Sequence, residues 1–374
     1  MTRTLKSLGL AGMVFLLPLL ISVVYPTSDH AFSVNAAEKK EPKYKDVKTR
    51  KRASVGKTCS KALDRVRGEK SPIAEAGDAE EGVDVTPFFL EAKEMLEDIE
   101  KSSKKCSSAY EETQVWSTMG YVYFALDDIP GAAIYYRKIV DSDGAEPEFR
   151  LDTRLTLGQF YAAMEKYEMA IEQYEIWAEA AFVVGAQERL TMAQLYYQLE
   201  RKDDSLRSVK LGISEAEAKG ILPKESFWAL GTALYNEKNQ MDKVIDYLEK
   251  LVTHYPKWKY WKQLGGMFGA QERMTDQLVA YEVIYLNGEL TKESDVLAMA
   301  YMYLGAEVPY RAAKIIEKGI KDKIVEKNFK HYDLLGKSWF LAQHIPQALS
   351  SYETASKYSD NGEIQYLIGS TYLD

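Results

Sequence analysis

WSTMGYVYFALDDIPGAAIYYRKIVDSDG, residues Trp116–Gly144, contains the pattern that decides the fold. A small residue, Gly120, is followed one helical turn later by the aromatic Tyr123, and Tyr136 comes after a short break at Asp127–Pro130. Apolar residues on both sides of the break recur at the three- and four-residue spacing of amphipathic helices. The stretch therefore predicts two helices joined by a short turn, with a small residue where the helices approach each other closely.

The small residue recurs along the chain in the same setting. The spacings are 38, 35, 39, 33, 35, 36 and 33 residues, and we call these eight residues the anchors: Gly120, Gly158, Ala193, Thr232, Gly265, Ala300, Gly336 and Gly369. A helix-turn-helix unit of about 34 residues with this small/large pattern is typical of the tetratricopeptide repeat. Because such units bury their apolar faces only against their neighbours, the sequence predicts an all-α, right-handed superhelical solenoid.

The spacing also predicts the bounds of the repeats within residues 110–374. Seven repeats and a final half repeat are expected, over residues 113–146, 151–184, 186–218, 225–256, 258–290, 293–323, 329–358 and 362–374. Residues 54–109 are expected to form a degenerate helix pair that caps the N-terminal end, with an acidic loop inserted at 69–85. The final helix lacks a partner, which favours either a lone cap or weak self-association.

The first 36 residues have the features of a secretory signal peptide. Arg3 and Lys6 precede an apolar run from Leu8 to Val24, and a small-residue site ends at Ala36. We expect cleavage after Ala36 and export of the repeats. An uncleaved membrane-spanning segment is the alternative, because the run is close to the ~20 residues that cross a bilayer.

Charge is unevenly distributed in a chain of net charge −8. Residues 37–53 are rich in Lys and Arg and are expected to form a basic flexible arm, whereas 75–84 is acidic. The arm is interpreted either as a solvated linker or as a peripheral contact to an acidic partner or an anionic membrane surface. Nucleic acid is a poor partner for an exported chain with an acidic body.

The two cysteines, Cys59 and Cys106, both lie in the capping region. In an oxidising compartment an even pair favours a disulfide; two buried free thiols are the alternative. The four histidines are scattered and lack the spacing of metal ligands, so no metal site is expected. No cofactor is predicted either, and we expect a protein that is not an enzyme, because no phosphate loop, nucleophile elbow or paired His/Asp arrangement is present.

Recognition is then expected on the concave face, which first helices line in this repeat geometry. Counting from the repeat starts gives the candidate partner-binding residues Tyr121, Gln159, Gln194, Tyr197, Asn236, Lys259, Lys262, Tyr301 and Lys337. Aromatic and amide groups suit an extended peptide or a helix laid along a groove. The lysines indicate an acidic ligand for the C-terminal half, and the alternative is that several of these side chains pack between neighbouring repeats.

Three segments carry a family resemblance: YPKWKYWKQLGGMFG at Tyr255–Gly269, NGELTKESDVLAMAYMYL at Asn287–Leu304 and VPYRAAKIIEKGI at Val308–Ile320. They resemble exported tetratricopeptide proteins that accompany TonB-type energy-transduction systems of Gram-negative bacteria, and the basic stretch Thr49–Ala53 is similar to that family's start. The acidic insertion, the cysteines and the abrupt C-terminus depart from it.

The resemblance implies a periplasmic accessory of TonB, ExbB and ExbD that helps to energise outer-membrane uptake of iron chelates or other nutrients. It supplies no binding residues. Two other functions remain open at this stage: a scaffold for cell-wall or outer-membrane assembly proteins, and a solute- or glycan-binding protein with an aromatic groove.

Overall fold

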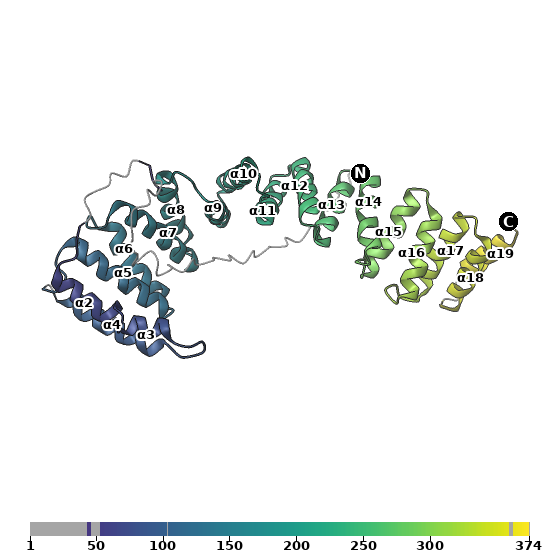
Figure 1. Ribbon diagram of the computed structural model, residues 1–374. Coiled ribbons are helices and arrows are strands. Elements are labelled where there is room, and N and C mark those ends of the chain that lie inside the picture. The colour runs from purple at the N-terminus through teal and green to yellow at the C-terminus, as the bar shows by residue number, and fades with distance from the viewer. Residues whose placement is uncertain (1–42, 46–52, 103, 359–361, 374) are drawn as a thin grey trace, which may run out of the picture. The chain divides into compact units, whose positions relative to one another are not determined.

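A computed structural model describes residues 43–45, 53–102, 104–358 and 362–373. These residues form helices and one isolated antiparallel bridge between Tyr44 and Ala181, with no strand among them. The chain divides into two compact units, residues 1–220 and 221–374, whose helices are labelled in Figure 1. The predicted signal segment, 1–36, lies outside the described residues.

Within the described residues of the first unit, the first helices are α2 (Lys57–Arg67), α3 (Pro72–Asp78) and α4 (Thr86–Lys101). A disulfide joins Cys59 to Cys106 and closes this cap. The segment expected as an acidic loop instead contains α3, which starts where the Ser71 side chain accepts a hydrogen bond from the Ala74 amide and a proline follows. A capped start of this kind stabilises even a short helix.

Helix pairs follow in both units, and they confirm the predicted all-α solenoid of tetratricopeptide-type repeats. The first unit contains α5 (Ala109–Ala125), α6 (Ile129–Asp141), α7 (Pro147–Ala163), α8 (Tyr167–Ala180), α9 (Ala186–Gln198) and α10 (Lys202–Ala218). The second contains α11 (Glu225–Glu237), α12 (Met241–His254), α13 (Trp258–Ala270), α14 (Met274–Leu286), α15 (Glu293–Gly305), α16 (Pro309–Lys321), α17 (Phe329–Leu341), α18 (Ile345–Ala355), a 3-10 turn (Ser356–Tyr358) and α19 (Gly362–Leu373).

The predicted starts of five repeats, at residues 186, 225, 258, 293 and 329, coincide with the first residues of α9, α11, α13, α15 and α17. The two earlier repeats begin four residues sooner than expected. In the first of them, the Ser108 side chain accepts from the Glu111 amide while Glu111 accepts from the Ser108 amide, which forms a capping box. In the second, Pro147 occupies the first helical turn. Local capping chemistry therefore extends these two helices beyond the apolar periodicity.

A glycine facing a tyrosine ring sets the packing inside most pairs. A Cβ atom added to Gly158 would lie 2.9 Å from the ring of Tyr174, sixteen residues later on the second helix. The same glycine-to-tyrosine offset and a similarly close approach recur at Gly120/Tyr136, Gly231/Tyr247, Gly265/Tyr281 and Gly336/Tyr352. No alanine could occupy these glycine positions without displacing the ring, because real Cβ atoms do not approach other atoms this closely.

The anchors that are not glycine are followed at the same offset by aliphatic residues instead of tyrosine: Val209 after Ala193, Leu248 after Thr232 and Ile316 after Ala300. All three aliphatic side chains are buried. In the repeat of Thr232 the glycine that meets a tyrosine is Gly231, one position before the expected anchor. A glycine is thus followed by a tyrosine at this offset, and a larger anchor is followed by a smaller, aliphatic side chain.

Each turn inside a pair contains one residue in the left-handed backbone conformation, seven positions after the anchor. These residues are Asp127, Glu165, Glu200, Asn239, Glu272, Glu307 and Gln343, with φ between 55° and 60°. A residue other than glycine rarely adopts this conformation. The recurrence of this conformation seven residues after the anchor of each pair is independent evidence that the anchors occupy the same position in every repeat.

The last helix, α19, packs against α18 and buries Ile364, but Tyr366 and Tyr372 are 75% and 65% exposed. The lone first helix predicted for this segment is therefore present. Its self-association stays a prediction.

Removal of the disulfide tests how strongly the cap depends on it. For a sequence separation of 47 residues, the loop-entropy estimate gives a loss of about 4 kcal/mol in the Cys59→Ala/Cys106→Ala variant. Native-state hydrogen exchange is expected to show lost protection in α2, α4 and α5, with the second unit unchanged as an internal control. Equal protection of α2 in the variant and the wild type would contradict a stabilising role for the bond.

Candidate functional site

The residues predicted to bind a partner in the first unit all lie on first helices, and none is fully buried: Tyr121, Gln159, Gln194 and Tyr197. Tyr121 meets the ring of Phe89 edge-on at 6.0 Å between centroids, and burial raises its pKa. The side chain of Gln159 is hydrogen-bonded to the Tyr174 hydroxyl of the adjoining helix. Tyr121 therefore packs against the preceding helix pair while solvent still reaches it, and Gln159 contacts the second helix of its own repeat.

The predicted lysines of the second unit have carboxylate partners. Lys262 on α13 is paired with Asp295 on α15, and Lys337 lies 2.7 Å from Asp333 within α17. Lys259 lies 3.9 Å from Glu225, a carboxylate that also accepts from Tyr260. These three lysines do not form the unneutralised basic surface that the sequence indicated. The remaining predicted residues of this unit, Asn236 and Tyr301, are exposed, and Tyr301 is exposed by 59%.

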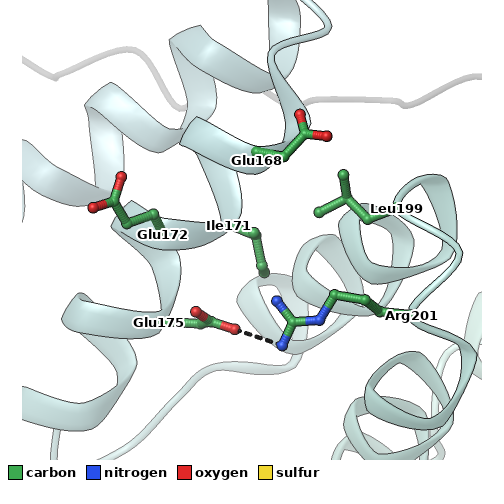
Figure 2. Close-up of a pocket in the computed structure, with 6 residues that line it drawn as sticks. All are labelled: Glu168, Ile171, Glu172, Glu175, Leu199 and Arg201. Atoms are coloured by element: carbon green, nitrogen blue, oxygen red, sulfur yellow. Dashed lines mark hydrogen bonds and ion pairs between the residues drawn. The ribbon is translucent and has the colours of Figure 1, made fainter.

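A cavity of about 320 Å³ lies in the first unit, between α8 and the turn that joins α9 to α10. It is lined by Glu168, Ile171, Glu172, Glu175, Leu199 and Arg201 (Figure 2). The three carboxylates follow one face of α8 at positions i, i+4 and i+7, and the buried Ile171 lies between them. Sequence analysis did not single out these glutamates, although their helical spacing was visible.

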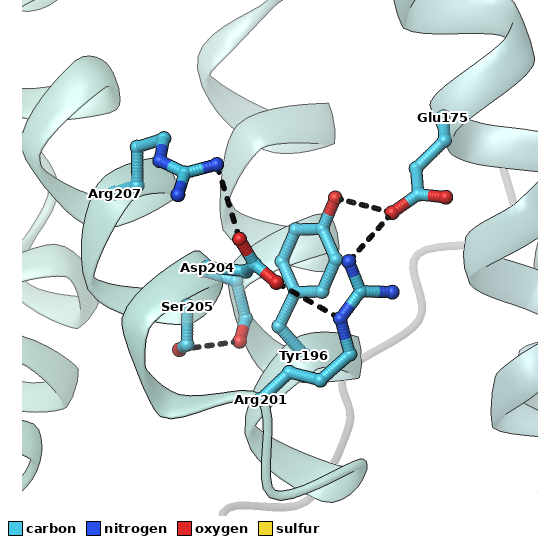
Figure 3. Close-up of polar contacts among 7 residues, drawn as sticks. Glu175, Tyr196, Arg201, Asp204, Ser205 and Arg207 are labelled. Atoms are coloured by element: carbon cyan, nitrogen blue, oxygen red, sulfur yellow. Dashed lines mark hydrogen bonds and ion pairs between the residues drawn. The ribbon is translucent and has the colours of Figure 1, made fainter.

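The single cation of this cavity is already engaged (Figure 3). Oε1 of Glu175 accepts from the Tyr196 hydroxyl at 2.9 Å and from Nη2 of Arg201 at 3.1 Å. Nε of Arg201 donates to Asp204 at 2.9 Å, and the guanidinium lies 4.6 Å from the centre of the Tyr196 ring. Burial, together with the bond to Glu175, raises the pKa of Tyr196, which stays protonated as the donor.

The same tyrosine–glutamate–arginine contact recurs in the second unit, where Glu282 accepts from the Tyr303 hydroxyl and from Nη1 of Arg311. Glu175 and Tyr196 have the same separation of 21 residues as Glu282 and Tyr303. Because this contact links a second helix to the following repeat in both units, Glu175 is better understood as structural. Glu168 and Glu172, both exposed, then give the cavity its negative charge.

Metal sites and membrane-spanning helices are both absent from the described parts of the chain. No group of three or more His, Cys, Asp or Glu side chains there is arranged to hold a metal ion. None of the helices in the same segments has both the length and the apolar character needed to cross a bilayer.

No protein-family model matches the chain, and no curated protein matches it. Solved structures that are similar to it are tetratricopeptide repeat proteins. A protein of this type from Parabacteroides merdae is 15% identical, with 71% of this chain and 99% of that chain covered and a TM-score of 0.39. The C-terminal part of one from Cytophaga hutchinsonii is 11% identical, with coverages of 66% and 96% and a TM-score of 0.41.

A third similar structure is YrrB, described as a tetratricopeptide protein with an unusual peptide-binding site. It is 12% identical, with coverages of 52% and 92% and a TM-score of 0.38. Similarities of this size carry no information on partners or cellular location, so the resemblance to TonB-associated proteins stays a prediction.

Substitution of Glu175 distinguishes a structural contact from a binding contact. Glu175→Ala leaves the Tyr196 hydroxyl and Arg201 without their shared acceptor, and we expect a loss of about 1 kcal/mol in the stability of the α8–α9 region, because the pair is partly exposed. Hydrogen exchange of the α9 amides measures it. Glu172→Ala on the same helix is the matched control, with a change within about 0.5 kcal/mol. Equal losses of stability in Glu175→Ala and Glu172→Ala would contradict a structural role for Glu175.

Proposed function

We propose that this protein is a non-enzymatic scaffold that binds another protein through the first-helix face of its first unit. One observation carries the proposal: Tyr121, Gln159 and Gln194 each follow the anchor directly in three successive repeats, and each is partly exposed. Residues at one register of stacked repeats form a row along the stack. The row can therefore contact a chain segment that runs across several repeats.

The chemistry of the row suits a polypeptide. Glutamine side chains both donate and accept hydrogen bonds, as does the tyrosine hydroxyl, and these groups match the amides of an extended or helical segment. Helices α5 and α7, which present Tyr121 and Gln159, are already ordered by the glycine–tyrosine packing. Little ordering of the scaffold is then required when the partner binds, which favours affinity.

The finer proposal is that the partner belongs to a TonB/ExbB/ExbD-type system in the periplasm. It is supported by the segments at Tyr255–Gly269, Asn287–Leu304 and Val308–Ile320, which resemble the exported accessory proteins of such systems. Under this proposal the protein assembles components that couple the inner-membrane proton gradient to nutrient uptake across the outer membrane.

A pull-down from native periplasm and solubilised inner membrane tests both the scaffold proposal and the proposal of a TonB-type partner. In the Gln159→Ala/Gln194→Ala variant the row loses its amides, and we expect recovery of the partner to fall about tenfold, the equivalent of roughly 1.4 kcal/mol of binding. The matched control is Ile134→Ala, which removes a 59% exposed side chain from the second helix α6. Circular dichroism confirms that each variant keeps its helical content.

Recovery of TonB, ExbB or ExbD by the wild type and the control, with loss in the double variant, supports the whole proposal. Recovery of cell-wall assembly proteins with the same dependence retains the scaffold and contradicts the TonB assignment. If all three proteins recover the same partners equally, the first-helix face of the first unit is not the binding surface.

A further inference from the structure

Three residues of the segment predicted as a flexible arm, Lys43–Lys45, are held against the first unit. The Lys45 amide donates to the carbonyl of Ala180 at 2.8 Å, and the Phe182 amide donates to the carbonyl of Lys43 at 3.1 Å. Together they form the antiparallel bridge between Tyr44 and Ala181. The prediction of a solvated arm does not hold here, because the end of α8 offers unpaired backbone groups that an extended segment can satisfy.

The Tyr44 side chain occupies a slot between α7 and α8 and is only 5% exposed. Its hydroxyl donates to Oδ1 of Asp152 at 2.5 Å and accepts from Nε1 of Trp177 at 3.1 Å. Burial, followed by the bond to the Asp152 carboxylate, raises the pKa of Tyr44, so the phenol remains a donor at neutral pH. Both hydrogen-bonding capacities of the phenol are therefore used at the end of an apolar slot.

The flanking lysines add weaker contacts. Nζ of Lys43 lies 3.7 Å from Oδ2 of Asp152, and Nζ of Lys45 donates to the carbonyl of Glu179 at 3.4 Å. Both contacts are exposed and contribute little stability individually. They do favour a segment that carries positive charge on each side of the tyrosine.

We propose that Asp152, Trp177 and the backbone of 180–182 form a recognition site for an extended peptide in which lysines flank a tyrosine, and that Lys43–Lys45 is a resident ligand that can be displaced. Backbone hydrogen bonds supply affinity and the tyrosine slot supplies specificity, as in other sites where an extended peptide pairs with exposed backbone. The site is separate from the first-helix row, so its test does not depend on the proposed function.

Displacement is consistent with the contacts of the three described residues. Two backbone hydrogen bonds, the two hydrogen bonds of the Tyr44 hydroxyl and two exposed lysine contacts hold them. Tethering adds to this binding, because it gives the segment an effective concentration on the order of millimolar at the site. A partner segment with the same core and additional contacts outside it competes successfully. Because Lys43–Lys45 must be displaced first, a ligand that binds more weakly than this segment does not occupy the site.

The test uses the fluorescein-labelled peptide EPKYKDV, which has the sequence of residues 41–47, and fluorescence anisotropy with the chain from residue 37 onward. In Tyr44→Ala the resident ring is absent, and we expect the peptide to bind at least tenfold more tightly than to the wild type. Addition of Asp152→Ala to that variant should reduce the affinity at least tenfold, whereas addition of Glu172→Ala should leave it unchanged. A peptide with alanine in place of tyrosine should not bind.

Equal affinity of the wild type and Tyr44→Ala would overturn the proposal, and so would the absence of saturable binding to Tyr44→Ala at millimolar peptide. The variant Tyr44→Phe guards against misfolding, because it keeps the ring in the slot and loses only the hydrogen bonds of the hydroxyl. It should bind the peptide with an affinity between those of the wild type and Tyr44→Ala, at unchanged helical content.

Discussion

The contact between a glycine on the first helix and a tyrosine ring on the second is the constraint on which the structure depends. At Gly120, Gly158 and Gly336 there is no room for even one additional carbon atom beside the ring. Tyrosine fills the space left by the missing side chain, and the two helices are fixed at one distance and one register. Once that register is set, the turn places one residue in the left-handed conformation at a constant offset, as Glu165 and Glu272 illustrate.

Successive repeats pack through apolar contacts, such as those of Phe160 with Phe124 and Tyr136 of the preceding repeat, and polar contacts add to them. Glu175 and Glu282 each accept a hydrogen bond from a tyrosine hydroxyl and an arginine of the following repeat. Apolar packing therefore holds each pair together and also joins the repeats, and a shared carboxylate adds a polar contact at these two joints. The exposed Tyr301 on the first helix α15 takes no part in these two contacts, whereas Lys262 on α13 is paired with Asp295 of the following repeat.

The sequence predicted well the features that depend on local periodicity. Apolar spacing and the anchors located the helix pairs, and the starts of α9, α11 and α13 were placed without error. Features that depend on distant residues were not predicted. Tyr44 meets Asp152 across 108 positions, and no periodic pattern contains that information.

In the candidate site, too, the features set by local periodicity were predicted and those set by distant residues were not. The exposure of Tyr301 and the first-helix position of Gln194 followed from counting within a repeat. The neutralisation of Lys262 by Asp295, 33 residues away, did not, because it requires knowing how adjacent repeats face each other. The short helix α3 was missed because its seven residues have too few apolar positions to show a period.

Transfer of the glycine–tyrosine pair into a repeat that lacks it tests the packing account most directly. Ala300 and Ile316 occupy the two positions and are both buried. Ile316→Tyr alone should cost about 1–3 kcal/mol by overpacking, and Ala300→Gly alone about 1 kcal/mol. The account predicts that the double variant is more stable than Ile316→Tyr alone, with a favourable coupling of at least 0.5 kcal/mol in the hydrogen exchange of α15 and α16. Additive losses in the double variant would contradict it.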